Sequence, residues 1–409
     1  MSTGPGPGEP TDSARPDSAY SIPADADAGD AATDPGVIDP GVIDPLVIDA
    51  ASTSATAEPM PAAGFTPAAG PSEPSRPTLR EVAELSGVSL KTASRVFNGE
   101  QYVAPETAAR VRTAAVQLGF RPNTIARELR AGARSALVGL IIGDVANPFY
   151  ARIARGAERR LRDGGLRLIS ASSDEDPALE RALVSDLLER RVSAMLIVSC
   201  ESDHGYLQAE RNLGTPLAFL DRAPKDIDAD TVVLDNHGGV TEAVKQLTEH
   251  GHRRIAFVGD LGTLPTHLER VAAFEQAAAD TGLEDDEWRP YLRAGAHDTD
   301  KGESEVRALL ELPVAPTALL TANNRITIGA LRALRTLPAD HRPALIGFDD
   351  FDLADMLGIT VIAHDPERMG ELGAELLLDR LAGRWGQSRR VLMPTRLLAR
   401  GSGERPAAA

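Results

Sequence analysis

Two basic side chains, Lys91 and Arg95, lie four residues apart in a segment that can form a helix. Leu90, Ser94 and Asn98 fall on the same side of that helix. An ammonium or guanidinium group donates hydrogen bonds to guanine in the DNA major groove, and an apolar side chain contacts the thymine methyl group. This small, polar and positive face therefore indicates a helix that reads DNA.

The flanking residues predict two short helices around a tight turn. Thr78 and Glu81 form a capping-box pattern that starts the first helix. Gly87 tolerates positive φ in the turn, and Ser89 can cap the second helix. The expected inner faces are Val82, Ala83 and Leu85 in the first helix and Ala93, Val96 and Phe97 in the second. A plain helical hairpin with a solvated outer face is the alternative that this pattern leaves open.

A third helix is expected to cover both inner faces. Pro105 suits its first position, and Gly119 suits its end. Its apolar stripe comprises Ala108, Val111, Ala114, Ala115 and Leu118.

From residue 136 onward, apolar segments of strand length alternate with amphipathic segments of helix length, such as 149–163 and 178–190. The expected strands are 136–142, 166–169, 194–198, 216–220, 231–234, 254–258, 318–321, 344–348 and 360–363, with edge strands at 389–392 and 396–398 after a helix at 367–382. Apolar strands with helical crossovers predict parallel sheets covered on both faces. Because nine strands are many for one such sheet, two lobes are favoured.

Polar side chains follow these strands repeatedly, at the edge where open α/β sheets bind ligands. They are Asp144 and Asn147 after the first strand, then Asp221-Arg222, Asp235-Asn236, Asn323-Asn324 and Asp349-Asp350. Any one of them also suits an ordinary turn. Their carboxylate and amide acceptors suit a polyhydroxylated ligand, and Phe149 or His297 could stack on its apolar face.

Charge divides the 409 residues, whose formal net charge is −17. Residues 1–76 carry 12 acidic and 2 basic residues, whereas 77–134 carry 9 basic and 5 acidic residues. The basic segment is thus the part that suits a polyanion. Residues 1–76, rich in Pro, Gly and Ala, are expected to be a disordered acidic tail, either passive or competing with DNA for that segment. The single cysteine, Cys200, and the lack of a signal peptide or membrane-length apolar run predict a cytoplasmic, nucleoid-associated protein.

The segment 120–130, with the run Arg-Pro-Asn-Thr-Ile-Ala-Arg-Glu-Leu-Arg, makes the pattern specific. Together with the paired helices it resembles the LacI (lactose repressor and purine repressor) family of bacterial transcriptional regulators. The resemblance implies a hinge that becomes helical on operator DNA and inserts Leu129 into the minor groove. It implies base contacts by Leu90, Lys91 and Arg95. The full expected DNA-binding set is Thr78, Ser89, Leu90, Lys91, Thr92, Ser94, Arg95, Asn98, Tyr102, Asn123, Arg127, Leu129 and Arg130.

The same resemblance implies a two-lobed core like periplasmic sugar-binding proteins, with an effector between the lobes. Arg270, Asn323 and Asp349 match effector-binding positions, and the expected set is Asp144, Asn147, Phe149, Asp221, Arg270, His297, Asn323 and Asp349. Asn324 departs from the usual Asp, and His364 from a frequent Gln. Residues 357–360 also differ from the family's Pro-Leu-Thr-Thr run. These departures prevent transfer of any particular effector, such as a sugar or a nucleoside-like molecule.

The expected fold is an all-α helix-turn-helix headpiece followed by an α/β two-lobed core of the periplasmic-binding-protein type with parallel sheets. The expected domains are the tail 1–76, the DNA-binding domain 77–122, the hinge 123–135 and the effector and dimerisation domain 136–405. The expected function is that of a DNA-binding regulator, most simply a repressor, controlled by a small molecule. The short carboxy-terminal segment after residue 400 predicts a homodimer, which would read a near-palindromic operator.

Two other classes of function are alternatives to this hypothesis. A sugar-binding receptor without a DNA role fits the core but leaves residues 77–130 unexplained. An enzyme is disfavoured because the sequence has no Walker loop, nucleophile elbow or Cys/His metal spacing. His252, in a Gly-His-Arg-Arg turn, is interpreted as a turn residue and not as a metal ligand. No cofactor, metal or membrane partner is expected.

Overall fold

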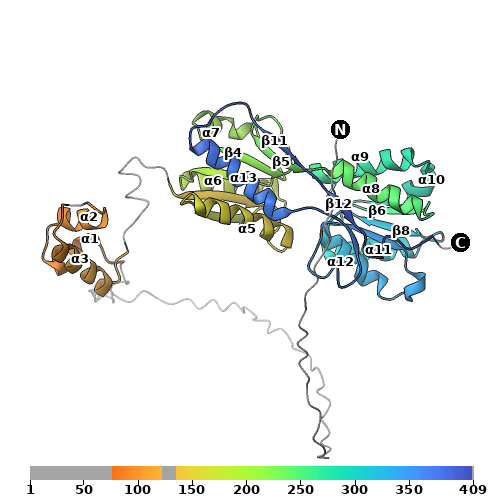
Figure 1. The fold of residues 1–409 in the computed structure, drawn as a ribbon, viewed down its shortest axis with the longest axis horizontal. Coiled ribbons are helices and arrows are strands. Elements are labelled where there is room, and N and C mark those ends of the chain that lie inside the picture. The colour runs from red at the N-terminus through yellow and green to blue at the C-terminus, as the bar shows by residue number, and fades with distance from the viewer. Residues whose placement is uncertain (1–75, 101, 122–134, 408–409) are drawn as a thin grey trace, which may run out of the picture. The chain divides into compact units, whose positions relative to one another are not determined.

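The structure, a computed structural model, describes residues 76–100, 102–121 and 135–407 (Figure 1). The predicted tail, apart from its last residue, and the predicted hinge, apart from Ser135, lie outside the described residues. Four residues of the expected DNA-binding set, Asn123, Arg127, Leu129 and Arg130, lie outside them as well.

The headpiece contains α1 (Leu79–Ser86), α2 (Leu90–Phe97) and α3 (Pro105–Leu118), as the sequence predicts. The capping box is present: the Thr78 amide donates to the Glu81 carboxylate at 2.7 Å, and Thr78 Oγ1 accepts from the Glu81 amide. Gly87 and Gly119 end α1 and α3 with φ of 65° and 67°. Local sequence therefore specifies where each of these helices begins and ends.

The three helices share one small apolar core. Val82, Ala93 and Val111 are completely buried in it, one from each helix. The prediction for Leu85 is wrong, because its side chain is 53% exposed. Ser86 takes the inner position instead, since it lies one turn after Val82 and its hydroxyl donates to the Val82 carbonyl at 2.6 Å.

Lobe 1 has a six-stranded sheet in the order β11-β5-β4-β3-β1-β2. Its elements are β1 (Leu137–Ile142), α5 (Pro148–Asp163), β2 (Arg167–Ser172), α6 (Pro177–Glu189), β3 (Ala194–Ile197), η1 (Gly205–Leu207), α7 (Gln208–Asn212), β4 (Leu217–Asp221), β5 (Asp230–Leu234), α13 (Pro366–Leu381) and β11 (Arg390–Met393). Successive residues of β1 face opposite cores: Leu140 packs with α5 and α13, and Ile141 with α6. The sheet is thus covered on both faces, as expected.

Lobe 2 has a second six-stranded sheet in the order β12-β10-β9-β8-β6-β7. Its elements are α8 (Asn236–Glu249), β6 (Ile255–Val258), α9 (Pro265–Asp280), α10 (Asp285–Trp288), η2 (Arg289–Tyr291), β7 (Leu292–Arg293), α11 (Thr299–Leu310), β8 (Ala318–Thr321), α12 (Asn324–Leu334), η3 (Ala339–His341), β9 (Ala344–Phe348), β10 (Thr360–Ala363) and β12 (Arg396–Leu398). The chain crosses between the lobes after β5, after β10 and after β11 (Figure 1).

The two-lobed fold, its parallel sheets and all the predicted strands are confirmed, and the one antiparallel pairing lies at an edge of the second sheet. β12 runs antiparallel to β10, with Ile362 opposite Leu397. Only two residues separate β11 from β12, so no helical crossover can return the chain to the start of the second sheet. The two-residue strand β7 was also not expected, because its pattern is too short to register in the sequence.

Candidate functional site

The outer face of α2 presents the basic side chains predicted to read DNA. Lys91 and Arg95 are exposed there, and the apolar Leu90 is 48% exposed. A hollow of about 700 Å³ lies between this face and the start of α1; its lining includes Leu90, Lys91, Ser94 and Arg95 together with Thr78. Arg95 forms an ion pair with Glu100 at 3.3 Å, so it must exchange this exposed partner to contact a base.

Two other members of the expected DNA-binding set also hold α2 in place. The Ser89 hydroxyl accepts from the Thr92 amide at 3.1 Å and lies 2.9 Å from the Thr92 hydroxyl. Asn98 is the C-cap residue of α2, and Tyr102, just beyond it, is 94% exposed. The recognition face is therefore pre-formed, because the Ser89 side chain caps the start of its helix.

A second group of polar side chains occupies the carboxyl ends of strands in both lobes. We call it the interlobe cluster. It comprises Asp144, Asn147, Tyr150, Glu175, Asp221 and Arg222 of lobe 1, Asn236, Asp260, His267, Arg270, His297, Asn323, Asn324, Arg325 and Asp349 of lobe 2, and His364 on a crossing segment.

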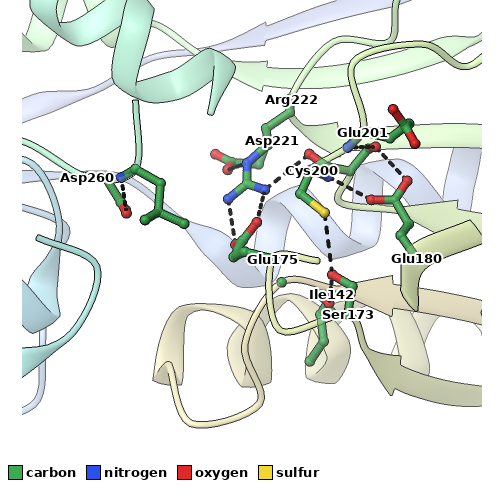
Figure 2. Close-up of polar contacts among 12 residues, drawn as sticks. Ile142, Ser173, Glu175, Glu180, Cys200, Glu201, Asp221, Arg222 and Asp260 are labelled. Carbon is green, nitrogen blue, oxygen red and sulfur yellow. Dashed lines mark hydrogen bonds and ion pairs between the residues drawn. The ribbon is translucent and has the colours of Figure 1, made fainter. Parts of the chain in front are cut away.

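Three buried side chains of the lobe 1 part of the cluster, Arg222, Glu175 and Tyr150, bond to one another. Arg222 donates two hydrogen bonds to the Glu175 carboxylate, at 2.6 and 2.8 Å (Figure 2). It donates a third to the Tyr150 hydroxyl at 3.1 Å. Burial raises the pKa of Tyr150 well above its usual value, so its phenol stays protonated and donates to Glu175 at 3.0 Å. Arg222 also donates to the Ser199 carbonyl. Its charge is thus already neutralised within lobe 1.

Asp221, at the end of β4, has no such complete set of partners. Its carboxylate Oδ2 is 3.6 Å from Arg222 Nε, which is an ion pair but too long for a hydrogen bond. Burial raises the pKa of Asp221, although Arg222 and Arg270 oppose this effect. Its backbone is left-handed, with φ of 64°. A buried, strained and partly unpaired carboxylate is the kind of group that a ligand satisfies.

In lobe 2, Asp260 joins two residues of the predicted effector site. His297 Nδ1 lies 2.7 Å from one carboxylate oxygen, and Asn323 Nδ2 donates to the other at 2.7 Å. The hydrogen bond to Asp260 raises the pKa of His297, and the same contact lowers the pKa of Asp260 against the effect of burial. Asn323 Oδ1 accepts from the Ile326 amide and caps α12. These residues are therefore held rigidly before any ligand binds.

Arg270, on α9, is buried and has no carboxylate partner within the cluster. Its Nε donates to Asn236 Oδ1 at 2.9 Å, and its Nη1 donates to the Ala322 carbonyl. The guanidinium carbon lies 3.6 Å from the centre of the Phe348 ring. Neutral groups thus fix the plane of this cation.

Asp349, after β9, pairs with His364, whose Nε2 donates to the carboxylate at 2.8 Å. The Phe149 ring packs edge-on against the His364 ring, with centroids 5.5 Å apart. A cavity of about 200 Å³ lies beside these residues, and Phe149, Asp349, His364 and Arg152 are part of its lining. Phe149 therefore packs against the lobe 2 side of the cluster and lines the adjacent cavity.

Direct contacts connect the two lobes at the cluster. Asn324 Nδ2 donates to Asn147 Oδ1 at 2.9 Å, and Arg325 forms an ion pair with Asp144. The structure therefore brings the predicted effector residues of both lobes into one connected group.

Five buried side-chain atoms of the cluster lack a hydrogen-bond partner: Asp221 Oδ1, Arg222 Nε, His267 Nδ1, Asn324 Oδ1 and His364 Nδ1. Elsewhere in the described chain the only other such atom is the Tyr206 hydroxyl oxygen. Buried polar groups without partners are costly, and their concentration in one place makes the cluster the candidate effector site.

Comparison with known proteins identifies the family. A family model described as "Bacterial regulatory proteins, lacI family" matches residues 78–123, and one described as "Periplasmic binding protein-like domain" matches residues 244–403. The regulator PtxS of Pseudomonas aeruginosa is 34% identical over 336 residues, which are 80% of this chain and 96% of the relative. This protein belongs to the LacI family. It is a helix-turn-helix transcriptional regulator with a two-lobed effector-binding core.

One solved structure supports the same assignment, and a second shows the same fold. A complex of the transcriptional regulator CelR with cellobiose is 30% identical with a TM-score of 0.59, covering 80% of this chain and 100% of that one. The lac repressor dimer bound to operator and the anti-inducer ONPF, 24% identical, has a TM-score of 0.66 and covers 80% of this chain and 99% of that one. The latter likeness concerns the fold alone.

For this LacI-family protein, sequence reasoning missed several cluster residues. Glu175, Tyr150 and Asp260 were not singled out, and Arg222 and Asn236 were noted only as strand-end neighbours. Glu175 and Asp260 also follow strands, β2 and β6, so their position was a usable signal. His364 was noted only because the family often has Gln at this position. Its contact with Asp349 could not be predicted, because the fold of the crossing segment brings the two residues together and no local sequence pattern indicates it.

Glu180, Ser199 and His204 form a buried hydrogen-bonded chain with the residue types of a hydrolase triad. The hydrogen bonds of this chain, however, run from His204 through Ser199 to Glu180, which is opposite to the direction that a catalytic serine needs. His204 Nδ1 accepts from the Lys225 amide at 3.0 Å, so its Nε2 donates to the Ser199 hydroxyl at 2.7 Å. Ser199 then donates to Glu180 at 2.6 Å. No base is available to take the Ser199 proton toward His204, so this chain is a structural network.

The second enzyme-like feature, His252, is also engaged in the fold. Its Nδ1 lies 3.0 Å from the Thr317 hydroxyl and its Nε2 lies 2.8 Å from the Arg405 carbonyl. Within the described ranges, no helix has the length and apolar character required to cross a membrane.

Proposed function

We propose that this protein binds operator DNA through the outer face of α2 and releases or strengthens that binding when a small molecule occupies the interlobe cluster. The observation that carries the proposal is the concentration of unpaired buried polar atoms where the two lobes meet. A ligand there contacts both lobes at once, so its binding energy changes their relative position. A sugar or sugar derivative is the best candidate, and the CelR complex with cellobiose supports it.

In the headpiece, we assign base contacts to Lys91, Arg95 and Leu90, and phosphate contacts to Thr92, Ser94 and Asn98. Leu129, outside the described residues, is proposed to insert into the minor groove. Such binding places the protein with the DNA in the bacterial cytoplasm.

A homodimer is proposed from an apolar hollow of about 690 Å³ on lobe 2. Leu353 and Leu357 line it and are each 56% exposed, and Ile328 and Leu331 of α12 add to its apolar floor. Exposed apolar surface of this kind favours association. A second copy related by two-fold symmetry would present two headpieces to a near-palindromic operator. The lac repressor dimer on operator supports this assembly.

The test is a fluorescence-anisotropy titration of the full chain with DNA from its own promoter and adjacent genes. Specific binding should weaken steeply as salt rises, because phosphate contacts release counterions. Arg95→Ala should reduce operator affinity roughly 5- to 150-fold, the range expected for a lost base contact. Arg110→Ala on the exposed side of α3 is the matched control and should retain most of the affinity.

A second variant addresses the hinge. Leu129→Ala should weaken operator binding far more than binding to random DNA, because intercalation at a defined step contributes to specificity. Equal losses on both DNAs would contradict the minor-groove role. Absence of salt-sensitive specific binding to every promoter offered would contradict the proposed function itself.

A further inference from the structure

Arg325, the second residue of α12 in lobe 2, makes its polar contact with the other lobe. Its guanidinium group forms an ion pair with Asp144, which follows β1 in lobe 1. Among the described residues, Asp144 is its only hydrogen-bonding or ion-pairing partner. A guanidinium group carries five N–H donors. Arg325 therefore adds no polar contact to its own lobe, and its charge acts at the junction between the two lobes.

The place of Arg325 within α12 is unfavourable for a cation. The N-terminal end of a helix carries partial positive charge, which disfavours a cation there and favours an anion. Asp349, the lobe 2 carboxylate at this helix end, bonds to the Asn324 amide and to the His364 ring. Neutralisation of the Arg325 cation therefore comes from lobe 1, through Asp144.

Asp144 is held in place for this contact. Its Oδ1 accepts from the Ala146 amide at 2.7 Å, and its Oδ2 is the atom paired with Arg325. Both of its oxygens thus have partners, in contrast to Asp221, whose Oδ1 has none among the described residues. Although its position after β1 suits an effector contact, the bonds of Asp144 suit a contact between the lobes.

A second ion pair across the lobes is more exposed. Arg152 of α5 pairs with Asp352 in the loop after β9, and their side chains are 38% and 83% exposed. The corresponding values for Arg325 and Asp144 are 22% and 15%. Solvent and salt screen an exposed pair strongly, whereas removal of one partner from a more buried pair leaves a poorly solvated charge. Substitution in the Asp144–Arg325 pair should therefore affect the lobes more.

We propose that Arg325 is a positioning residue for regulation: through Asp144 it holds the lobes together at the effector site, and its charge sets how readily they separate. The proposal rests on the proposed function, in which lobe position controls DNA binding, and it assigns the contact that opposes separation. It requires no contact between Arg325 and the effector. Like charges at this junction would repel each other and drive the lobes apart.

The test measures the separation of the lobes by double electron–electron resonance on the full-length protein. Spin labels are attached to Val145→Cys, beside Asp144, and to Asp300→Cys, three residues after His297 of the cluster; both positions are exposed. The native Cys200 is buried, which protects it from the label. Excess unlabelled protein is added, so that the two labels of a measured pair lie in one copy.

Arg325→Glu places two carboxylates at the junction and should lengthen the mean distance between the labels. Asp144→Arg places two cations there and should lengthen it as well. The double variant Asp144→Arg, Arg325→Glu restores a pair with exchanged charges and should return the distance to that of the parent protein. Arg307→Glu is the matched control, because it breaks an ion pair with Glu303 inside α11 of lobe 2, and it should leave the distance unchanged.

An unchanged distance in Arg325→Glu would overturn the proposal. A double variant that stays as open as Arg325→Glu would overturn it too, because the effect would then not depend on the pair with Asp144.

Anisotropy with operator DNA on the same variants separates this proposal from the proposed function. The two single variants should change operator affinity in the same direction, by roughly fivefold or more, and the double variant should restore it. If the labels move apart but the affinity stays constant, the role of the ion pair in holding the lobes stands and the proposed regulation fails. If the affinity changes while the distance does not, the regulation stands and the role of Arg325 in lobe position fails.

Discussion

At the scale of single residues, the cluster concentrates backbone strain with its polar atoms. Asp221 and Asp349 have φ of 64° and 70°, and each lies at the carboxyl end of a strand, β4 or β9. Glu175, which holds Arg222, is also left-handed at 57°. Left-handed backbone is unfavourable for these residue types and persists where the surrounding fold fixes it. The two lobes thus place carboxylates toward one another by the same local device.

Gly143, after β1, provides the space that the Glu175–Arg222 pair occupies. A Cβ atom at this position would collide with the Glu175 carboxylate and lie 2.7 Å from the Tyr150 hydroxyl oxygen. Gly143→Ala should therefore lower the free energy of unfolding by about 1–3 kcal/mol, measured by urea denaturation. Gly262→Ala is the control, because nothing lies within 4 Å of its Cβ position, and its effect should stay within about 0.5 kcal/mol. Equal midpoints for the two variants would show that the pair tolerates displacement.

At the scale of elements, local signals predicted most of the fold. The side chain of Thr78 caps the first helix, and Gly87 and Gly119 end helices because they have no side chain. These residue types alone therefore predicted where the headpiece helices begin and end. The prediction that Leu85 is buried was wrong because a short helix has few inward positions. Ser86 takes one of them, since its hydroxyl is hydrogen-bonded within the helix. Asp260 and His364 were missed as site residues because their partners come from distant segments, which periodicity does not reveal.

Ser89 illustrates how an element and its function share one residue. Ser89→Ala removes the cap of α2 and should speed amide hydrogen exchange in this helix roughly 2- to 30-fold in the full chain, which corresponds to about 0.5–2 kcal/mol. Ser89→Asp should keep exchange slow, because Asp caps as well as Ser, but should weaken DNA binding by bringing a carboxylate toward phosphates. If Ser89→Asp exchanged as fast as Ser89→Ala, the capping role would be refuted.

At the scale of the whole molecule, regulation requires that the effector change more than one lobe. Asn147 and Asn324 join the lobes directly, and the chain crosses between them three times. Thr395, on the last crossing, donates to the Asp235 carbonyl on the first at 3.0 Å, which ties these two segments to each other. We therefore expect the lobes to close by a concerted rotation about the crossing segments, which suits a two-state response to a ligand.

An effector-driven change in the lobes can alter operator binding only if two copies act together as a dimer. In the proposed dimer, the apolar hollow of lobe 2 is the contact between the two copies. Leu357→Glu places a charge at its rim and should shift the protein from dimer to monomer in sedimentation-velocity experiments, because removing a carboxylate from water at an apolar contact opposes association. Operator affinity should fall by orders of magnitude, whereas a single half-site should bind with little change, since each headpiece keeps its own fold. Leu213→Glu, 79% exposed on lobe 1 and outside the hollow, is the matched control and should remain dimeric. A Leu357→Glu protein that sediments as a dimer would show that the copies associate through another surface.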